Sequence, residues 1–132
     1  MKYDRFEDLP VWKAAINLAI QIHCMTAKVP FRGRFSLRDQ IERAAVSVSN
    51  NIAEGFERGT KKEFVQFLNI AKGSNGEVRS QLYAALDQEY VSEKDFNAMR
   101  DAAICLARRL SSLIRYLESY RSNSRVRKAG KC

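Results

Sequence analysis

Hydrophobic side chains recur at steps of three and four residues along four successive segments of this chain of 132 residues. This spacing places the apolar side chains on one face of an α-helix, and no stretch shows the alternation that is typical of a half-buried strand. Pro and Gly are scarce, with two and six copies, so few breakers interrupt the pattern. The repeat therefore predicts an all-α fold of four amphipathic helices.

Breakers and capping residues set the limits of these segments. The predicted helices span residues 9–27, 37–54, 61–88 and 93–120. Ser36, Thr60 and Ser92 are each followed three residues later by an acid, which is typical of a helix N-cap. Gly55 is predicted to end the second helix in the left-handed conformation. The links are short, so we expect an antiparallel, up-down-up-down four-helix bundle over residues 1–120.

Two glycines lie inside the third predicted helix, at Gly73 and Gly76. Each costs about 1 kcal/mol of helix propensity relative to Ala. Their presence predicts either a kink in this helix or the close approach of another backbone.

The charge is unevenly distributed along the chain. The formal net charge is +8, and five basic residues lie among the last twelve positions, which contain no acid. Residues 121–132 are polar and aperiodic, so we predict a disordered basic tail. Such a tail favours a polyanionic partner, with nucleic acid as the first hypothesis, although it could equally be a solvated segment that aids solubility.

The sequence contains no motif for crossing or anchoring in a membrane. Its first eight residues are too charged for the core of a signal peptide, and no apolar run approaches the roughly 20 residues that a membrane span needs. We therefore expect a cytoplasmic protein without a membrane partner.

Catalytic and metal-binding motifs are also absent from the sequence. His23 is the only histidine, and its spacing places it on the apolar face of the first helix. There is no paired Glu-x-x-His, no Cys-x-x-Cys, no Walker A loop and no Gly-x-Ser-x-Gly. The expectation is a protein that is not an enzyme, with no catalytic residue, metal or cofactor; a small hydrolase or ligand-binding bundle is a minor alternative.

A group of polar and small residues shares one region of the second and third helices. Its members are Arg43, Ser47, Asn51, Glu54, Gly73, Ser74 and Glu77. Three interpretations stay open: a structural network in which Arg43 pairs with a glutamate between helices, a subunit interface, or a binding or catalytic site.

The same two helices carry the run from Arg43 to Gly55, RAAVSVSNNIAEG, and the run from Lys62 to Ser74, KEFVQFLNIAKGS. Together with the opening FEDL at residues 6–9, these runs resemble the 23S rRNA intervening-sequence proteins, a family of small bacterial four-helix bundles. The resemblance covers about residues 6–117 and leaves the basic tail outside.

The resemblance also implies an assembly and partners, which the residues alone do not indicate. Members look like ring-forming homopentamers encoded by reading frames inserted in rRNA genes. They are also similar in fold to the accessory protein of diversity-generating retroelements, a pentameric basic barrel that works with a reverse transcriptase and its RNA. The implied partners are therefore RNA, further copies of this chain, and a reverse transcriptase or another protein.

The basic residues are the candidates for phosphate contacts. They comprise Arg32, Arg34 and Arg38 at the first turn, Arg58, Lys61 and Lys62 at the second turn, Lys72, Arg79, Arg108, Arg109 and Arg115 along the helices, and Arg121, Arg125, Arg127 and Lys128 in the tail. No motif for reading bases is present, so binding should be independent of sequence and sensitive to salt. The resulting hypothesis is a non-enzymatic, homo-oligomeric RNA-binding or adaptor protein. The alternative is a scaffold that docks an acidic protein without nucleic acid.

Overall fold

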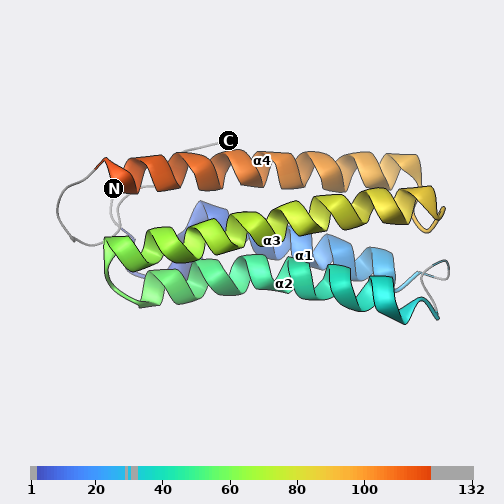
Figure 1. Ribbon diagram of the computed structural model, residues 1–132, viewed down its shortest axis with the longest axis horizontal. Coiled ribbons are helices and arrows are strands. Elements are labelled where there is room, and N and C mark those ends of the chain that lie inside the picture. The colour runs from blue at the N-terminus through green and yellow to red at the C-terminus, as the bar shows by residue number, and fades with distance from the viewer. Residues whose placement is uncertain (1–2, 29, 31–32, 120–132) are drawn as a thin grey trace.

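The computed structural model describes residues 3–28, 30 and 33–119. It contains four helices, α1 (Pro10–Thr26), α2 (Phe35–Glu57), α3 (Lys61–Asp87) and α4 (Glu93–Glu118), after a short 3-10 helix, η1 (Phe6–Asp8). Successive helices run in opposite directions (Figure 1), which confirms the predicted all-α, up-down-up-down bundle. The predicted disordered tail at 121–132 lies outside the described residues.

Each helix contributes one apolar stripe to a shared core. Side chains that are almost completely buried include Ile22, Ile41, Ile52, Phe64, Leu68, Leu82, Leu106, Leu110 and Leu113. Removal of this apolar surface from water is the main force that holds the helices together. Helices α2 and α3 share the most extensive contact, while α1 and α4 share the least of the four neighbouring pairs. The α1–α4 edge is therefore the loosest edge of the bundle.

Local capping explains where two of the helices begin. The backbone amide of Glu63 donates to Thr60 Oγ1 at 3.2 Å, and that of Asp95 donates to Ser92 Oγ at 3.1 Å. Both N-caps were predicted from the sequence, and each satisfies an amide that has no partner inside its helix. The predicted cap at Ser36 is wrong, because α2 already begins at Phe35 and its start has no side-chain cap.

The predicted left-handed end at Gly55 is also wrong. Helix α2 continues to Glu57, and Gly59, with φ +89°, supplies the left-handed residue in the turn before α3. Gly55 is instead buried against α3, where an added Cβ would lie 2.5 Å from Phe67 Cβ and 3.0 Å from Phe64 Cδ1. Gly55 is therefore a point of close helix approach.

For Gly73 and Gly76, the sequence predicted a kink or the close approach of another backbone. Helix α3 continues past both, and nothing within the described chain lies within 4 Å of a Cβ added at either position. The predicted close approach is therefore not made at these glycines by any described part of this chain. Separately, no helix among the described residues is both long and apolar enough to cross a lipid bilayer.

Candidate nucleic-acid interface

Three of the predicted phosphate-binding residues lie along one flank of α3. Lys61, Lys72 and Arg79 are separated by eleven and seven residues. A helix turns by about 100° per residue, so these spacings bring the three side chains to within about 20° of one another around its axis. The helix thus carries a line of cations along its length.

Contacts with α4 show which flank this is. Asn75 Nδ2 donates to the backbone carbonyl of Ala103 at 2.8 Å, and the Tyr83 ring packs at an angle of 67° against Phe96, with ring centroids 4.9 Å apart. Around the axis of α3, the line of cations lies between Asn75 and Tyr83. The three cations therefore lie on the side of α3 that meets α4.

Helix α4 carries two further basic candidates. Arg108 and Arg115 are exposed and two turns apart, so they share a face of α4. Arg115 donates to Ser112 Oγ at 3.3 Å. We call the set formed by Lys61, Lys72, Arg79, Arg108 and Arg115 the basic α3–α4 face.

Acidic side chains do not neutralise this face by direct pairing within the described structure. The ion pairs there join Arg5 to Asp8, Lys28 to Asp95, Arg43 to Asp39, Arg58 to Glu54 and Glu63, and Arg100 to Asp101. None of them uses a member of the basic α3–α4 face. Its five charges are therefore available to an anion from outside the chain.

Apart from Lys61, the candidates at the two turns lie outside this face. Arg34 and Arg38 are at the end of the bundle that carries the turn before α2, and Arg58 and Lys62 are at the opposite end (Figure 1). The guanidinium carbons of Arg34 and Arg38 lie 5.5 Å and 5.4 Å from the ring centroids of Tyr90 and Phe35, respectively.

Two further candidates are poorly placed for phosphate. Arg58 is 3.1 Å from Glu54 and 3.7 Å from Glu63, so its charge is already compensated. Arg109 is half-buried, and its Nε is enclosed without a hydrogen-bond partner among the described residues. The remaining candidates, Arg32, Arg121, Arg125, Arg127 and Lys128, lie outside the described residues.

Arg100 is a basic residue that the sequence analysis did not select. It lies on α4 beside Phe96, with its guanidinium carbon 5.4 Å from the ring centroid. A hydrogen bond with Asp101 is the main cause of the raised pKa of Arg100, and Tyr83 also contributes. The sequence gives no signal for this residue, because its place depends on how α3 and α4 meet.

Part of the predicted polar group forms a seam between α2 and α3. Ser47 Oγ and Ser74 Oγ are hydrogen-bonded at 2.9 Å. Asn51 Nδ2 donates to the Ser47 carbonyl at 2.8 Å and to its hydroxyl at 3.0 Å. These three residues therefore join the two helices in the manner of a structural network.

The charged members of the group do not join that seam. Arg43 pairs with Asp39 of its own helix at 2.9 Å, so the predicted pairing of Arg43 with a glutamate between helices is wrong. Glu54 pairs with Arg58 just after the end of its own helix, while Gly73 and Glu77 are exposed. A shallow hollow of about 320 Å³ between α2 and α3 is lined by Gln40, Arg43, Ala44, Ser47, Ser74, Glu77 and Gln81.

The spacing of His23 predicted a position on the apolar face of the first helix, but the structure places this residue at the surface. It is exposed, and its Nδ1 is 2.8 Å from the Ala19 carbonyl oxygen one turn earlier. Nearby, the hydroxyl of Thr26 donates to the Glu42 carboxylate and so joins α1 to α2. Within the described part of the chain, no group of three His, Cys, Asp or Glu side chains is placed to bind a metal ion.

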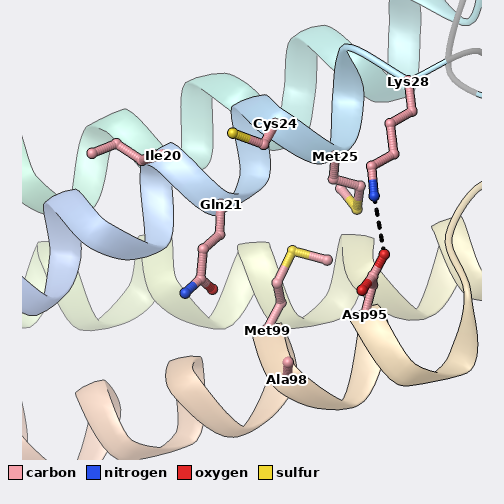
Figure 2. Close-up of a pocket in the computed structure, with 8 residues that line it drawn as sticks. All are labelled: Ile20, Gln21, Cys24, Met25, Lys28, Asp95, Ala98 and Met99. Carbon is pink, nitrogen blue, oxygen red and sulfur yellow. Dashed lines mark hydrogen bonds and ion pairs between the residues drawn. The ribbon is translucent and has the colours of Figure 1, made fainter.

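A second hollow, of about 260 Å³, lies along the loose α1–α4 edge (Figure 2). It is lined by Ile20, Gln21, Cys24, Met25, Lys28, Asp95, Ala98 and Met99. The Met25 and Met99 side chains point toward one another across the gap, and Lys28 Nζ pairs with Asp95 Oδ2 at 3.1 Å. None of the predicted phosphate-binding residues lines this hollow.

Comparison with known proteins shows which family and which solved structure this chain resembles. Residues 7–112 match the family model described as 23S rRNA-intervening sequence protein. A crystal structure of a protein of unknown function from the S23 ribosomal protein family of Bacteroides thetaiotaomicron has a TM-score of 0.73 to this chain at 22% identity. That match covers 79% of this chain and 97% of the other, and at this identity it supports the fold alone. No curated protein matches the chain significantly.

Proposed function

This chain belongs to the 23S rRNA-intervening sequence protein family, and from that premise we propose that it is a non-enzymatic, RNA-binding or adaptor protein. The observation that carries the proposal is the basic α3–α4 face, whose five cations have no ion-pair partner among the described residues. Lys and Arg contacts to phosphate supply affinity that does not depend on base sequence.

The shape of the face suits an extended polyanion better than a single small anion. Lys61 and Arg79 are eighteen residues apart, which is about 27 Å along a helix. Cations spread over that length contact several phosphates in succession and release the counterions that surround them. Binding should therefore weaken steeply as salt is added.

We also propose that the protein acts as a homo-oligomer, with the pentamer implied by its family as the expected size. Three large apolar side chains outside α3 and α4 remain exposed in the single chain, namely Ile20, Phe35 and Val46. Repetition of the basic α3–α4 face around a ring would strengthen binding to a long RNA.

The direct test is fluorescence anisotropy of a labelled, structured RNA across a salt series. Lys72→Gln combined with Arg79→Gln should weaken binding and reduce the salt slope by about 0.7–0.9 for each lost phosphate contact. The matched control is Lys13→Gln combined with Lys94→Gln, which removes two exposed charges outside the basic α3–α4 face. An equal loss in this control would mean that only the overall charge matters. Absence of binding at low salt would exclude the RNA-binding function.

A chain ending at Tyr120 separates the helical body from the basic tail. We expect this chain to retain salt-dependent binding, because the basic α3–α4 face is intact. If most of the affinity disappears, the tail residues carry the binding and the site proposed on the helices is wrong.

The alternative function is a scaffold on which the same cations dock an acidic protein. The two functions differ in their response to nuclease. A partner that stays bound to the purified protein after nuclease treatment supports the scaffold, whereas one that is released supports an RNA bridge.

A further inference from the structure

Tyr83 is an aromatic residue that is both exposed and held in place. It lies on α3, and 52% of its surface is accessible to solvent. Its ring packs against Phe96 of α4, and the guanidinium carbon of Arg100, one turn further along α4, lies 5.4 Å from the Phe96 ring centroid. A ring fixed by its neighbours loses little conformational freedom when a ligand binds to it.

Tyr83 lies on the same flank of α3 as the line of cations. It follows Arg79 by four residues and Lys72 by eleven, so all three side chains lie within about 40° around the axis of α3. Tyr83 is about 6 Å beyond Arg79 along the helix. The exposed ring therefore stands at one end of the line, with two cations following it on the same flank.

We propose that Tyr83 is a stacking platform for an unpaired base, and that the basic α3–α4 face therefore takes single-stranded RNA. This inference rests on the proposed RNA-binding function and specifies its substrate class. A base can stack on a protein ring only when it is not enclosed in a duplex. Arg79 and Lys72 then contact phosphates of the strand that leads away from the stacked base.

The charges around Tyr83 give the strand a direction. Asp87 lies one turn further along α3, whereas Arg79 lies one turn before the ring. Phosphates are therefore disfavoured beyond the ring and favoured toward Arg79. The strand should run from Tyr83 toward the middle of α3.

Phe35 is the strongest competing aromatic residue. It is more exposed than Tyr83, at 68%, and it is accompanied by Arg38. However, the hollow beside Phe35 is also lined by Asp39 and Glu42, whose carboxylates repel phosphate. Tyr83 is therefore the better site for a nucleic acid.

The experiment compares two RNA probes by fluorescence anisotropy: a labelled oligouridine of roughly 12 nucleotides, and an RNA duplex of the same length. Tyr83→Ala and Tyr83→Leu should each weaken single-strand binding by roughly five- to 150-fold and leave the salt slope unchanged. Tyr83→Phe should bind as the native protein does. Duplex binding should be unaffected in all three variants.

Ile70→Ala is the matched control, since Ile70 also lies on α3 and is also 52% exposed. It should bind both probes as the native protein does. Tyr83→Leu preserves apolar packing on Phe96, and thermal unfolding of each variant checks that the bundle is intact.

The outcomes distinguish this inference from the function on which it rests. Native affinity for the single strand in Tyr83→Leu, with a steep salt slope, overturns the stacking platform and leaves the RNA-binding function in place. Equal losses for strand and duplex also overturn it, because the ring then does not select unpaired bases. If the native protein binds neither probe at low salt, the RNA-binding function itself fails.

Discussion

At the scale of single residues, Gly55 determines how closely α2 and α3 pack. It is buried, and the Cβ and ring of neighbouring phenylalanines occupy the space that a side chain would need. The absence of a side chain allows the most extensive helix contact in the bundle. Glycine at this position lowers the helix propensity of α2 but allows α2 and α3 to pack closely.

Gly55→Ala should destabilise the protein by about 1–3 kcal/mol, because overpacking outweighs the gain in helix propensity. Gly73→Ala is the matched control, since nothing within the described chain occupies its side-chain space. The control should be neutral or stabilising by up to about 1 kcal/mol. Urea unfolding of both variants measures the difference, and equal stabilities would contradict the packing role of Gly55.

Two consecutive polar residues tie α3 to different neighbours. Ser74 is hydrogen-bonded to Ser47 of α2, and Asn75 donates to the Ala103 carbonyl of α4. Adjacent residues differ by about 100° around a helix, so one can face α2 while the next faces α4. Asn75 Oδ1 is buried without a partner among the described residues, and burial of an unpaired oxygen costs free energy. The hydrogen bond to Ala103 therefore fixes how α3 meets α4 at some cost in stability.

At the scale of the helices, the α1–α4 edge combines loose packing with an exposed ion pair. The Lys28–Asp95 bridge, at 3.1 Å, joins the turn after α1 to the first turn of α4 beside the apolar hollow. The hydrogen bond from Lys28 is the main cause of the lowered pKa of Asp95. The bridge is therefore a link whose strength depends on pH.

The pH dependence of this link has a definite sign. Because the pKa of Asp95 is lowered from its usual value of 3.8, the pair stabilises the fold fully above about that pH. The contribution disappears as the pH falls through the lowered value. Asp95→Asn should therefore lower the thermal midpoint slightly at neutral pH and low salt, and the difference from the native protein should vanish at strongly acidic pH.

Solvent screening keeps this effect small, since both side chains are exposed. Lys28→Met is the companion variant, and the double variant should lose no more than either single one. A difference between Asp95→Asn and the native protein that persists in strong acid would assign the effect to the first turn of α4 instead of the ion pair.

At the scale of the whole molecule, charge is separated between faces of the bundle. Arg43 and Arg58 of α2 are paired with nearby acids, whereas the basic α3–α4 face has no such partners among the described residues. The net charge of +8 includes five cations at residues 121–132, so the rest of the chain carries only a small part of it. The surface that is free to attract a polyanion is narrower than the overall charge suggests.

The proposed assembly predicts a mass in solution of about five times the 15.1 kDa of one chain. Size-exclusion chromatography with light scattering measures this mass, and nuclease treatment at high salt removes any association through bound RNA. A mass equal to that of one chain under these conditions would exclude the homo-oligomer.

The four helices, their antiparallel order and the starts at Thr60 and Ser92 could be predicted from the sequence alone. These features depend on apolar periodicity and on hydrogen bonds between residues three positions apart, which are local properties of the chain. The family was also evident from the ordered residues of the second and third helices.

Which flanks of the helices meet became clear only from the folded bundle. It assigned the close approach to Gly55 instead of Gly73, gave Arg43 a partner on its own helix, and packed Tyr83 of α3 against Phe96 of α4. Spacing along the chain fixes which residues share a face of one helix. How each helix is rotated against its neighbours depends on packing of the whole core, which local sequence does not specify.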